Sequence, residues 1–177
     1  MIFKESNIKG LYTIELTPAS DERGFFARNF CKEEFLKQGI EFNILQINQS
    51  LTKQKGTIRG MHFQKEPKAE DKIVQCLKGL IYDVAIDLRK DSSTYGQWAV
   101  EELTEDNKRM FLIPKGFAHG FQALTDNCKI QYFVSEFYSW ENESGVRWDD
   151  PFLNIKWPLT PTVISEKDKN WPLIPHP

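Results

Sequence analysis

The sequence predicts an all-β fold of two packed sheets, a jelly roll or double-stranded β-helix, with one or two short helices. Short runs rich in valine, isoleucine, phenylalanine and tyrosine recur along the chain, and turn residues separate them at short intervals. This pattern is typical of β-sandwiches and barrels. The 177 residues fit a single domain spanning 1–177, and no linker, low-complexity tract or fixed-period repeat divides them.

The clearest predicted strand spans residues 80–88. Its apolar and acidic residues alternate, with Asp83 and Asp87 on one face and four apolar side chains on the other: Tyr82, Val84, Ile86 and Leu88. Further strands are expected at 11–16, 25–30, 42–51, 57–63, 72–78, 97–103, 109–113, 118–124 and 129–137. A short helix is expected at 32–37, with Phe35 and Leu36 pointing inward. The proline-rich tail from Asp149 onward should wrap the surface as loops and turns.

Charge and composition exclude several classes of partner. The formal net charge is −2, which offers no general attraction to nucleic acid or to an acidic membrane. No apolar run approaches the ~20 residues of a membrane span, and the first residues lack the apolar core of a signal peptide. The cysteines, Cys31, Cys76 and Cys128, are widely spaced and form no zinc-site pattern. We therefore expect reduced thiols and a cytoplasmic protein.

Two of the three histidines lie in informative segments. PKGFAHGF places His119 in the order Pro-x-Gly-x-x-His, which is half of the metal-binding motif of cupins. In metal cupins an earlier strand adds His-x-His and a glutamate, but GTIRGMHFQKE offers His62 alone. Two imidazoles make a poor transition-metal site, so no metal is expected. A metal-dependent cupin with Glu66 as third ligand is the alternative. His176 is expected to have no role.

Cationic residues accompany these histidines. Arg59 and Lys72 lie in adjoining predicted strands, where arginine suits phosphate and lysine suits a developing oxyanion. In a regular strand Arg59 and His62 would lie on opposite faces, because they are three residues apart. A bulge at Gly60 would bring them to one face. The alternative is that His62 and His119 are half-buried histidines of a sheet face.

The order of several motifs carries a family resemblance. They are DERGFF (21–26), GTIRGMHFQ (56–64), KIVQCLKGLIYDVAIDLRKDSSTYGQW (72–98), PKGFAHGF (114–121), the 132–138 stretch, GVRWDDP (145–151) and ISEKD (164–168). Together they cover nearly the whole chain. The chain resembles the dTDP-4-keto-6-deoxyglucose 3,5-epimerase family of the cupin superfamily.

The resemblance implies a cupin homodimer that uses no metal and no organic cofactor. It assigns His62 as the base, held by Asp168 of ISEKD. It makes Tyr132 the acid on the opposite sugar face, and it places Lys72 at the enolate oxygen with His119 near the same end. The chemistry is reasonable because a neutral histidine accepts protons near pH 7. A proton beside a ketone becomes removable when the enolate oxygen is stabilised.

The resemblance also implies a set of substrate-binding residues. Arg23 and Arg59 match arginines at the pyrophosphate or sugar end, and Phe26 and Tyr138 match positions near the nucleotide. Gln46 is expected in the same set. Some of these contacts come from the partner subunit in the family.

Two features differ from the family pattern. Arg28, also expected at the substrate, stands where members acting on dTDP-sugars often carry glutamate, so a CDP- or other nucleotide sugar is an alternative to dTDP. Glu70 and Asp71 precede Lys72 and are expected to be solvated loop charges.

The expected reaction inverts C3 and C5 of a nucleoside-diphosphate 4-keto-6-deoxyhexose. It would convert dTDP-4-dehydro-6-deoxyglucose to dTDP-4-dehydrorhamnose. Inversion of one carbon only, or binding of a nucleotide sugar without catalysis, are the alternatives.

Overall fold

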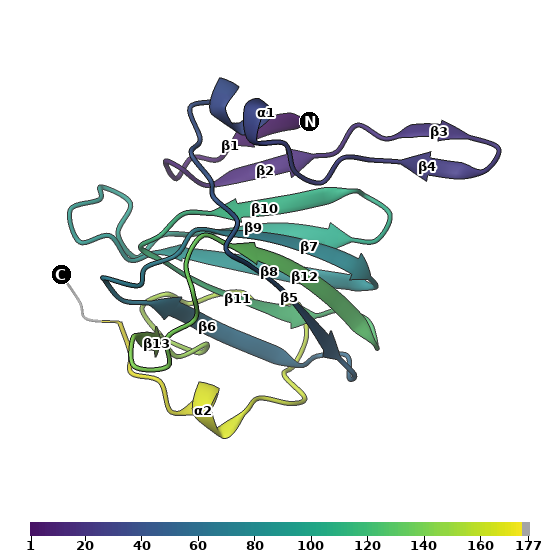
Figure 1. The fold of residues 1–177 in the computed structure, drawn as a ribbon. Coiled ribbons are helices and arrows are strands. Elements are labelled where there is room, and N and C mark those ends of the chain that lie inside the picture. The colour runs from purple at the N-terminus through teal and green to yellow at the C-terminus, as the bar shows by residue number, and fades with distance from the viewer. Residues whose placement is uncertain (175–177) are drawn as a thin grey trace.

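Two antiparallel sheets face each other in the computed structural model, which describes residues 1–174 (Figure 1). His176 lies outside the described residues. The six-stranded sheet has the order β1 (Ile2–Glu5), β2 (Tyr12–Glu15), β10 (Arg109–Ile113), β7 (Lys72–Lys78), β12 (Cys128–Val134), β5 (Gln46–Thr52). The five-stranded sheet has the order β13 (Glu143–Gly145), β6 (Ile58–Gln64), β11 (Phe117–Ala123), β8 (Leu80–Asp87), β9 (Trp98–Thr104). The predicted all-β jelly-roll class is confirmed.

Several predicted elements agree with the structure in both of their bounds. Strands 72–78 and 109–113 and helix α1 (Lys32–Lys37) have the expected bounds. The prediction missed β1, β3 (Ala19–Asp21) and β13, because strands of three or four residues carry little periodicity. It also missed the short helix α2 (Glu166–Lys169) within the proline-rich tail.

Two expected strands were too long, and one side chain was misplaced. The strand expected at 25–30 ends at Phe26 as β4 (Gly24–Phe26), and the one expected at 42–51 begins only at Gln46. Phe35 of α1 is fully buried, as predicted, but Leu36 is exposed. Consecutive helical residues point about 100° apart, and only Phe35 faces the sheet.

Three apolar clusters divide the molecule into layers. The first lies between the two sheets and includes Val74, Phe111 and Phe121. The second covers the outer face of the six-stranded sheet, where Phe35 and Phe42 pack on residues of β2, β7, β10 and β12. The third covers the outer face of the five-stranded sheet with side chains of the tail: Leu153, Ile155, Trp157 and Ile174. Apolar clusters therefore lie on both faces of each sheet, and β8 is nearly continuously buried although its residues alternate.

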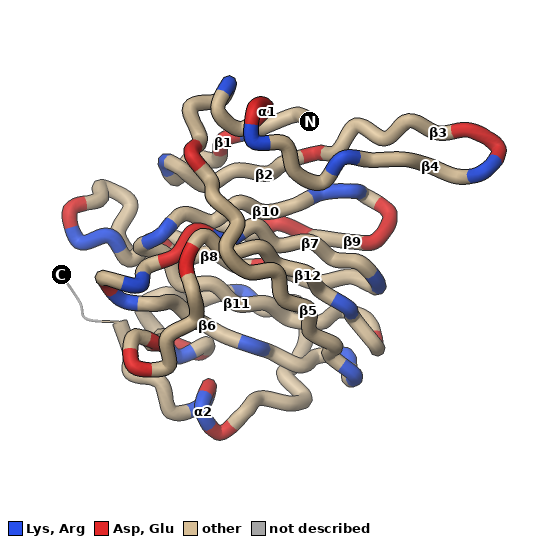
Figure 2. The backbone as a smooth tube through the Cα atoms, viewed as in Figure 1, with Lys and Arg blue, Asp and Glu red and all other residues tan. Residues whose placement is uncertain are grey.

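A two-stranded hairpin of β3 and β4 projects from the body of the molecule (Figure 1). Its tip carries both acidic and basic residues, as Figure 2 shows. Phe25 and Phe26 of β4 are 58% and 72% exposed. Neither helix among residues 1–174 is long and apolar enough to cross a membrane.

Candidate active site

A groove opens between the inner faces of the two sheets. One cavity of about 480 Å³ and a second of about 340 Å³ share His62, Lys72 and Tyr132 in their linings, so the two form one continuous groove. Phe121 and Ile130 of the central apolar cluster close the floor of the larger cavity. Concave sites with an apolar floor and a few polar groups are typical of ligand binding.

His62 of β6 forms a hydrogen-bonded pair with Asp168 of α2. The two residues are 106 positions apart, and His62 Nε2 lies 2.6 Å from Asp168 Oδ1. The second oxygen, Oδ2, accepts from the Gly60 backbone N–H at 3.2 Å. Ser165 caps α2 by accepting from the Asp168 N–H, which fixes the start of this short helix. The fold therefore holds the carboxylate in one orientation toward the histidine.

These hydrogen bonds decide the charge state of Asp168. Burial alone would raise the pKa of its carboxyl, but the bonds from His62, Gly60 and Ser165 lower the pKa below its usual value. The carboxylate is thus ionised at neutral pH and only accepts hydrogen bonds. A neutral His62 consequently carries its proton on Nε2, which leaves Nδ1 unprotonated as the basic atom.

A bulge in β6 brings Arg59 and His62 to the same face. His62 is opposite His119 in the register with β11, and Arg59 is opposite Phe121, so three steps along β6 match two along β11. Gly60 lies in the bulge with φ of +135°, and a Cβ there would lie 2.5 Å from the Gly120 Cα. Only glycine fits this conformation and this close approach. The distortion predicted at Gly60 is confirmed.

His119 of β11 pairs with a buried carboxylate that the sequence analysis did not identify. Its Nε2 lies 2.7 Å from Asp83 Oδ1, and Asp83 is fully buried on the inward face of β8. Among the described residues Asp83 Oδ2 has no hydrogen-bond partner. Burial raises the pKa of Asp83, although His119 and Lys72 oppose this effect. The sequence pattern pointed the other way, since Asp83 lies on the strand face opposite Tyr82, Val84 and Ile86, and these pack under the tail on the outer face of the sheet.

Lys72 is ion-paired, and the prediction of solvated acidic neighbours was wrong. Lys72 Nζ lies 2.9 Å from Glu70 Oε1, and the two side chains are 13% and 10% exposed. Asp71 accepts from the Lys115 backbone N–H at 2.9 Å and from Ser135 Oγ at 3.1 Å. Both acids therefore have protein partners and are not solvated loop charges.

Tyr132 lies on the wall opposite the two histidines. It and Lys72 are on the six-stranded sheet, whereas His62 and His119 are on the five-stranded sheet. Each occupies an inward strand position, next to apolar inward residues such as Val74 and Ile130. Burial raises the pKa of Tyr132, and the charge of Glu70 raises it further.

Gln46 and Tyr138 are at the second cavity. The Tyr138 backbone N–H donates to Gln46 Oε1 at 2.6 Å, and the Tyr138 hydroxyl donates to Glu143 Oε2 at 2.8 Å. Glu143 also pairs with Lys167 of α2 at 2.5 Å. Sequence reasoning missed Glu143 and Lys167 as groove residues, although Lys167 lies within the ISEKD motif.

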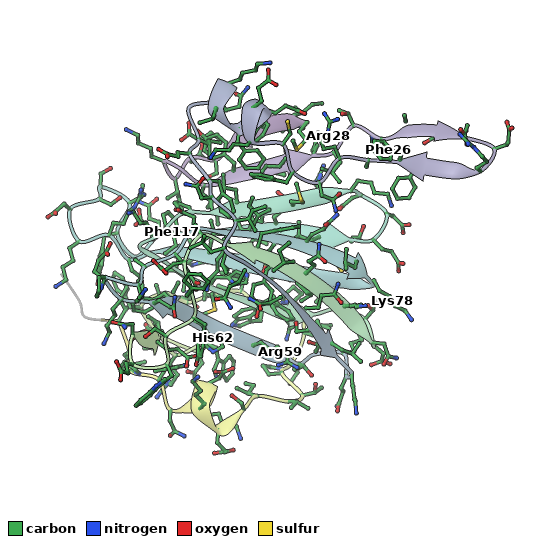
Figure 3. All side chains as sticks on the ribbon, in the orientation of Figure 1. Phe26, Arg28, Arg59, His62, Lys78 and Phe117 are labelled. Atoms are coloured by element: carbon green, nitrogen blue, oxygen red, sulfur yellow. The ribbon has the colours of Figure 1, made fainter. Side chains whose placement is uncertain are left out.

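Three predicted substrate-binding residues do not reach the groove of their own chain. Arg23 and Phe26 lie on the projecting hairpin, and Arg23 pairs there with Asp21. Arg28 follows the hairpin and lies 3.5 Å from Glu34 of α1. Figure 3 shows Phe26 and Arg28 at the side of the molecule opposite Arg59 and His62.

The alternative metal site is not assembled in the structure. Among residues 1–174 no three His, Cys, Asp or Glu side chains come together as metal ligands. Glu66, the candidate third ligand, is exposed and lines a cavity other than the one shared by His62 and His119.

Comparison with known proteins identifies the family. The model of the dTDP-4-dehydrorhamnose 3,5-epimerase family matches residues 5–176. The protein of that name from Methanothermobacter thermautotrophicus is 45% identical over 99% of this chain and 96% of its own length.

Solved structures agree with this match. The Bacillus anthracis epimerase, crystallised with TDP and PPi, has a TM-score of 0.94 and 44% identity over 97% of this chain and 99% of its own. The Legionella pneumophila enzyme in complex with dTDP-4-keto-L-rhamnose has a TM-score of 0.93 and 38% identity over 98% and 92% of the two chains. The fold, the groove and these matches together show that the chain belongs to the dTDP-4-dehydrorhamnose 3,5-epimerase family, which are isomerases of nucleotide-linked deoxysugars.

Proposed function

We propose that this chain inverts C3 and C5 of dTDP-4-dehydro-6-deoxyglucose and so forms dTDP-4-dehydrorhamnose. The observation that carries the proposal is the placement of a His–Asp pair and a tyrosine on opposite walls of one groove. The ligands of the related structures support the nucleotide, since one holds TDP and PPi and another holds dTDP-4-keto-L-rhamnose.

The first step removes a proton from the carbon beside the C4 ketone. His62 Nδ1 takes the proton, and the C–H electron pair moves to the carbonyl oxygen to form an enolate. Asp168 stabilises the imidazolium through the 2.6 Å contact with Nε2. Lys72 donates to the enolate oxygen, and His119, whose Nε2 contacts Asp83, lines the same cavity. A positioned base typically contributes about 10²–10⁴-fold in rate, and an oxyanion donor about 10²–10³-fold.

The second step returns a proton to the opposite face of the same carbon. Tyr132 is suited to this step because it lies on the wall across from His62 and its raised pKa keeps the phenol protonated at neutral pH. The enolate collapses to the ketone as it takes the phenolic proton. His62 then releases its proton to solvent and the Tyr132 tyrosinate takes one up, which restores both groups. After this reset the same two steps invert the second carbon.

We also propose a homodimer in which the hairpin reaches the partner's groove. An isolated two-stranded hairpin is only marginally stable in water, yet β3–β4 presents Phe25 and Phe26 to solvent. The edge strand β5 likewise exposes Ile47 and Leu51, on the strand face opposite its groove-lining residues Gln46, Asn48 and Ser50. Exposed apolar residues on a hairpin and an edge strand are features of an association surface.

Such a dimer accounts for the predicted residues that the groove lacks. Arg23 would contact the pyrophosphate of the partner's substrate. Phe26 would contact the nucleobase, opposite Tyr138 and Gln46, and Arg28 would lie where the hairpin joins the body of the molecule. Sedimentation of the wild type and of Phe26→Ser tests the association. A monomeric wild type would contradict it.

Solvent exchange tests the proposed reaction directly. Incubation of dTDP-4-dehydro-6-deoxyglucose in D₂O should place deuterium at both C3 and C5, observed by NMR. His62→Ala should abolish the exchange while its circular dichroism stays unchanged. In Tyr132→Phe proton removal should persist while inversion fails. Deuterium at neither carbon would refute the proposal, and deuterium at one carbon would identify a single-site epimerase.

Two controls separate the other candidates. Parallel reactions with CDP-, UDP- and GDP-linked 4-keto sugars test the consequence of Arg28 for the nucleotide. Metal analysis of protein purified without chelator tests the metal-dependent alternative, which requires a stoichiometric ion at His62 and His119.

A further inference from the structure

Glu70 is a partly buried acid in the groove that the proposed reaction does not use. Its side chain is 10% exposed. Its Oε1 lies 2.9 Å from Lys72 Nζ, and its Oε2 accepts from Gln64 Nε2 at 3.3 Å. Gln64 is itself buried. Its Nε2 donates to the Lys68 carbonyl, and its Oε1 accepts from the Ser139 backbone N–H. The position of the Glu70 carboxylate is therefore set by the fold.

We infer that Glu70 is a positioning residue that fixes the Lys72 ammonium at the sugar and keeps a negative charge beside Tyr132, so that Tyr132 serves as the proton donor. This inference rests on the proposed function of the groove. It deepens that function by naming the residue that prepares both groups on the six-stranded wall.

The first contribution is to the position of the lysine. A lysine side chain has four flexible carbon bonds and three N–H donors. Glu70 accepts from the Lys72 ammonium and so restrains the side chain, which leaves the other N–H groups for the substrate oxygen. Preorganised donors stabilise an oxyanion far better than mobile ones. Removal of the anchor should therefore slow enolate formation more than it weakens binding.

The second contribution is to the protonation of Tyr132. Burial raises the pKa of this phenol most, the charge of Glu70 raises it next, and the charge of Arg59 lowers it. Glu70 is thus the carboxylate that offsets the arginine across the groove. Other titratable side chains line the same two cavities from the facing elements: His62 on β6, Lys72 on β7, His119 on β11, Glu143 on β13, and Lys167 and Asp168 on α2.

Two substitutions separate the two contributions. Glu70→Gln keeps an amide oxygen that accepts from Lys72 but removes the charge. We expect the exchange rate at pH 7 to fall less than in Glu70→Ala, and the alkaline limb of the pH–rate profile to move to lower pH. Glu70→Ala removes the anchor as well, and we expect kcat to fall by about 10-fold or more with a smaller change in KM.

A titration that needs no turnover provides the second measurement. The ultraviolet absorbance of tyrosinate is recorded against pH for Glu70→Gln and for the double variant Glu70→Gln/Tyr132→Phe. The difference between the two curves is the titration of Tyr132 alone among the five tyrosines. The same difference in the wild-type background gives the reference. We expect the Tyr132 midpoint to lie at lower pH in Glu70→Gln. Glu136→Gln is the matched control, because it breaks the Lys68–Glu136 ion pair of 3.2 Å, which lies outside both cavities.

Four results would count against the inference or the function. If the wild type is active, an unchanged Tyr132 midpoint in Glu70→Gln, or a wild-type exchange rate in Glu70→Ala, would overturn the positioning role of Glu70. A parallel loss of melting temperature and activity with an unchanged pH profile would make Glu70 merely structural and would also overturn it. A wild type without solvent exchange would refute the proposed function itself, while the titration still measures the coupling between Glu70 and Tyr132.

Discussion

Replacement of Asp168 by asparagine tests the orientation of the base with almost no change in shape. The Gly60 N–H, 3.2 Å from Asp168 Oδ2, needs an acceptor, so the single amide oxygen of the variant should turn toward it. The amide NH₂ then faces His62 Nε2, which must become an acceptor. The proton of the neutral ring moves to Nδ1, and the atom that should take the substrate proton is blocked.

The expected loss follows from two effects. A hydrogen bond to a charged group is worth about 1.5–3 kcal/mol, and stabilisation of the imidazolium disappears with the carboxylate. The wrong tautomer in a comparable Ser-His-Asp triad lowers kcat by about 10⁴-fold. We therefore expect Asp168→Asn to lower kcat for deuterium exchange by about 10²–10⁴-fold.

The assay is the initial rate of deuterium incorporation into dTDP-4-dehydro-6-deoxyglucose at pH 7. The melting temperature, taken beside it, identifies loss of folded protein. Asp149→Asn serves as the control, because Asp149 pairs only with the exposed Arg147 of the tail among the described contacts. A rate for Asp168→Asn near that of the wild type, in folded protein, would show that the carboxylate does not set the tautomer of His62.

Three further outcomes are expected. Gly60→Ala should destabilise the protein by about 2–5 kcal/mol in urea denaturation, because a positive φ costs about 1–2 and overpacking about 1–3 kcal/mol; an undiminished unfolding midpoint would contradict the bulge. The folded-state pKa of Asp168 is lowered, so its carboxylate contributes stability above the unfolded pKa of about 3.9, and this contribution is lost as pH falls through the folded-state pKa. Between pH 6 and pH 3 the free energy of unfolding should therefore fall less in Asp168→Asn than in the wild type. Equal losses in the two proteins would refute this linkage. Burial raises the pKa of Cys76 to about 12, so a thiol reagent should modify Cys31 in the native protein and spare Cys76, as peptide mapping would show; rapid labelling of Cys76 would contradict its burial.

Local composition was sufficient to predict most strands of the two sheets. Residues 72–78 and 109–113 are short runs rich in apolar residues, and their bounds were correct. The bulge was also predictable, since the spacing of Arg59 and His62 conflicts with alternation and Gly60 lies between them. These features depend on neighbours in the sequence.

Contacts between distant segments were not predictable in this way. The pairing of His62 with Asp168 spans 106 positions, and only the family resemblance indicated it. Asp83 and Glu70 were missed as partners of His119 and Lys72. From local sequence an acid on a strand or loop is predicted to face solvent, and only the assembled sheets show that it is buried. Burial of charge is a property of the assembled sandwich.

The position of α2 links the integrity of the base to the C-terminal tail. Asp168 lies on the same tail as Leu153 and Ile174, which cover the outer face of the five-stranded sheet. His62 has its carboxylate partner only while this tail is docked. Any opening of the tail would therefore bare apolar surface and disable proton abstraction in the same event, so catalytic competence reports on completion of the fold.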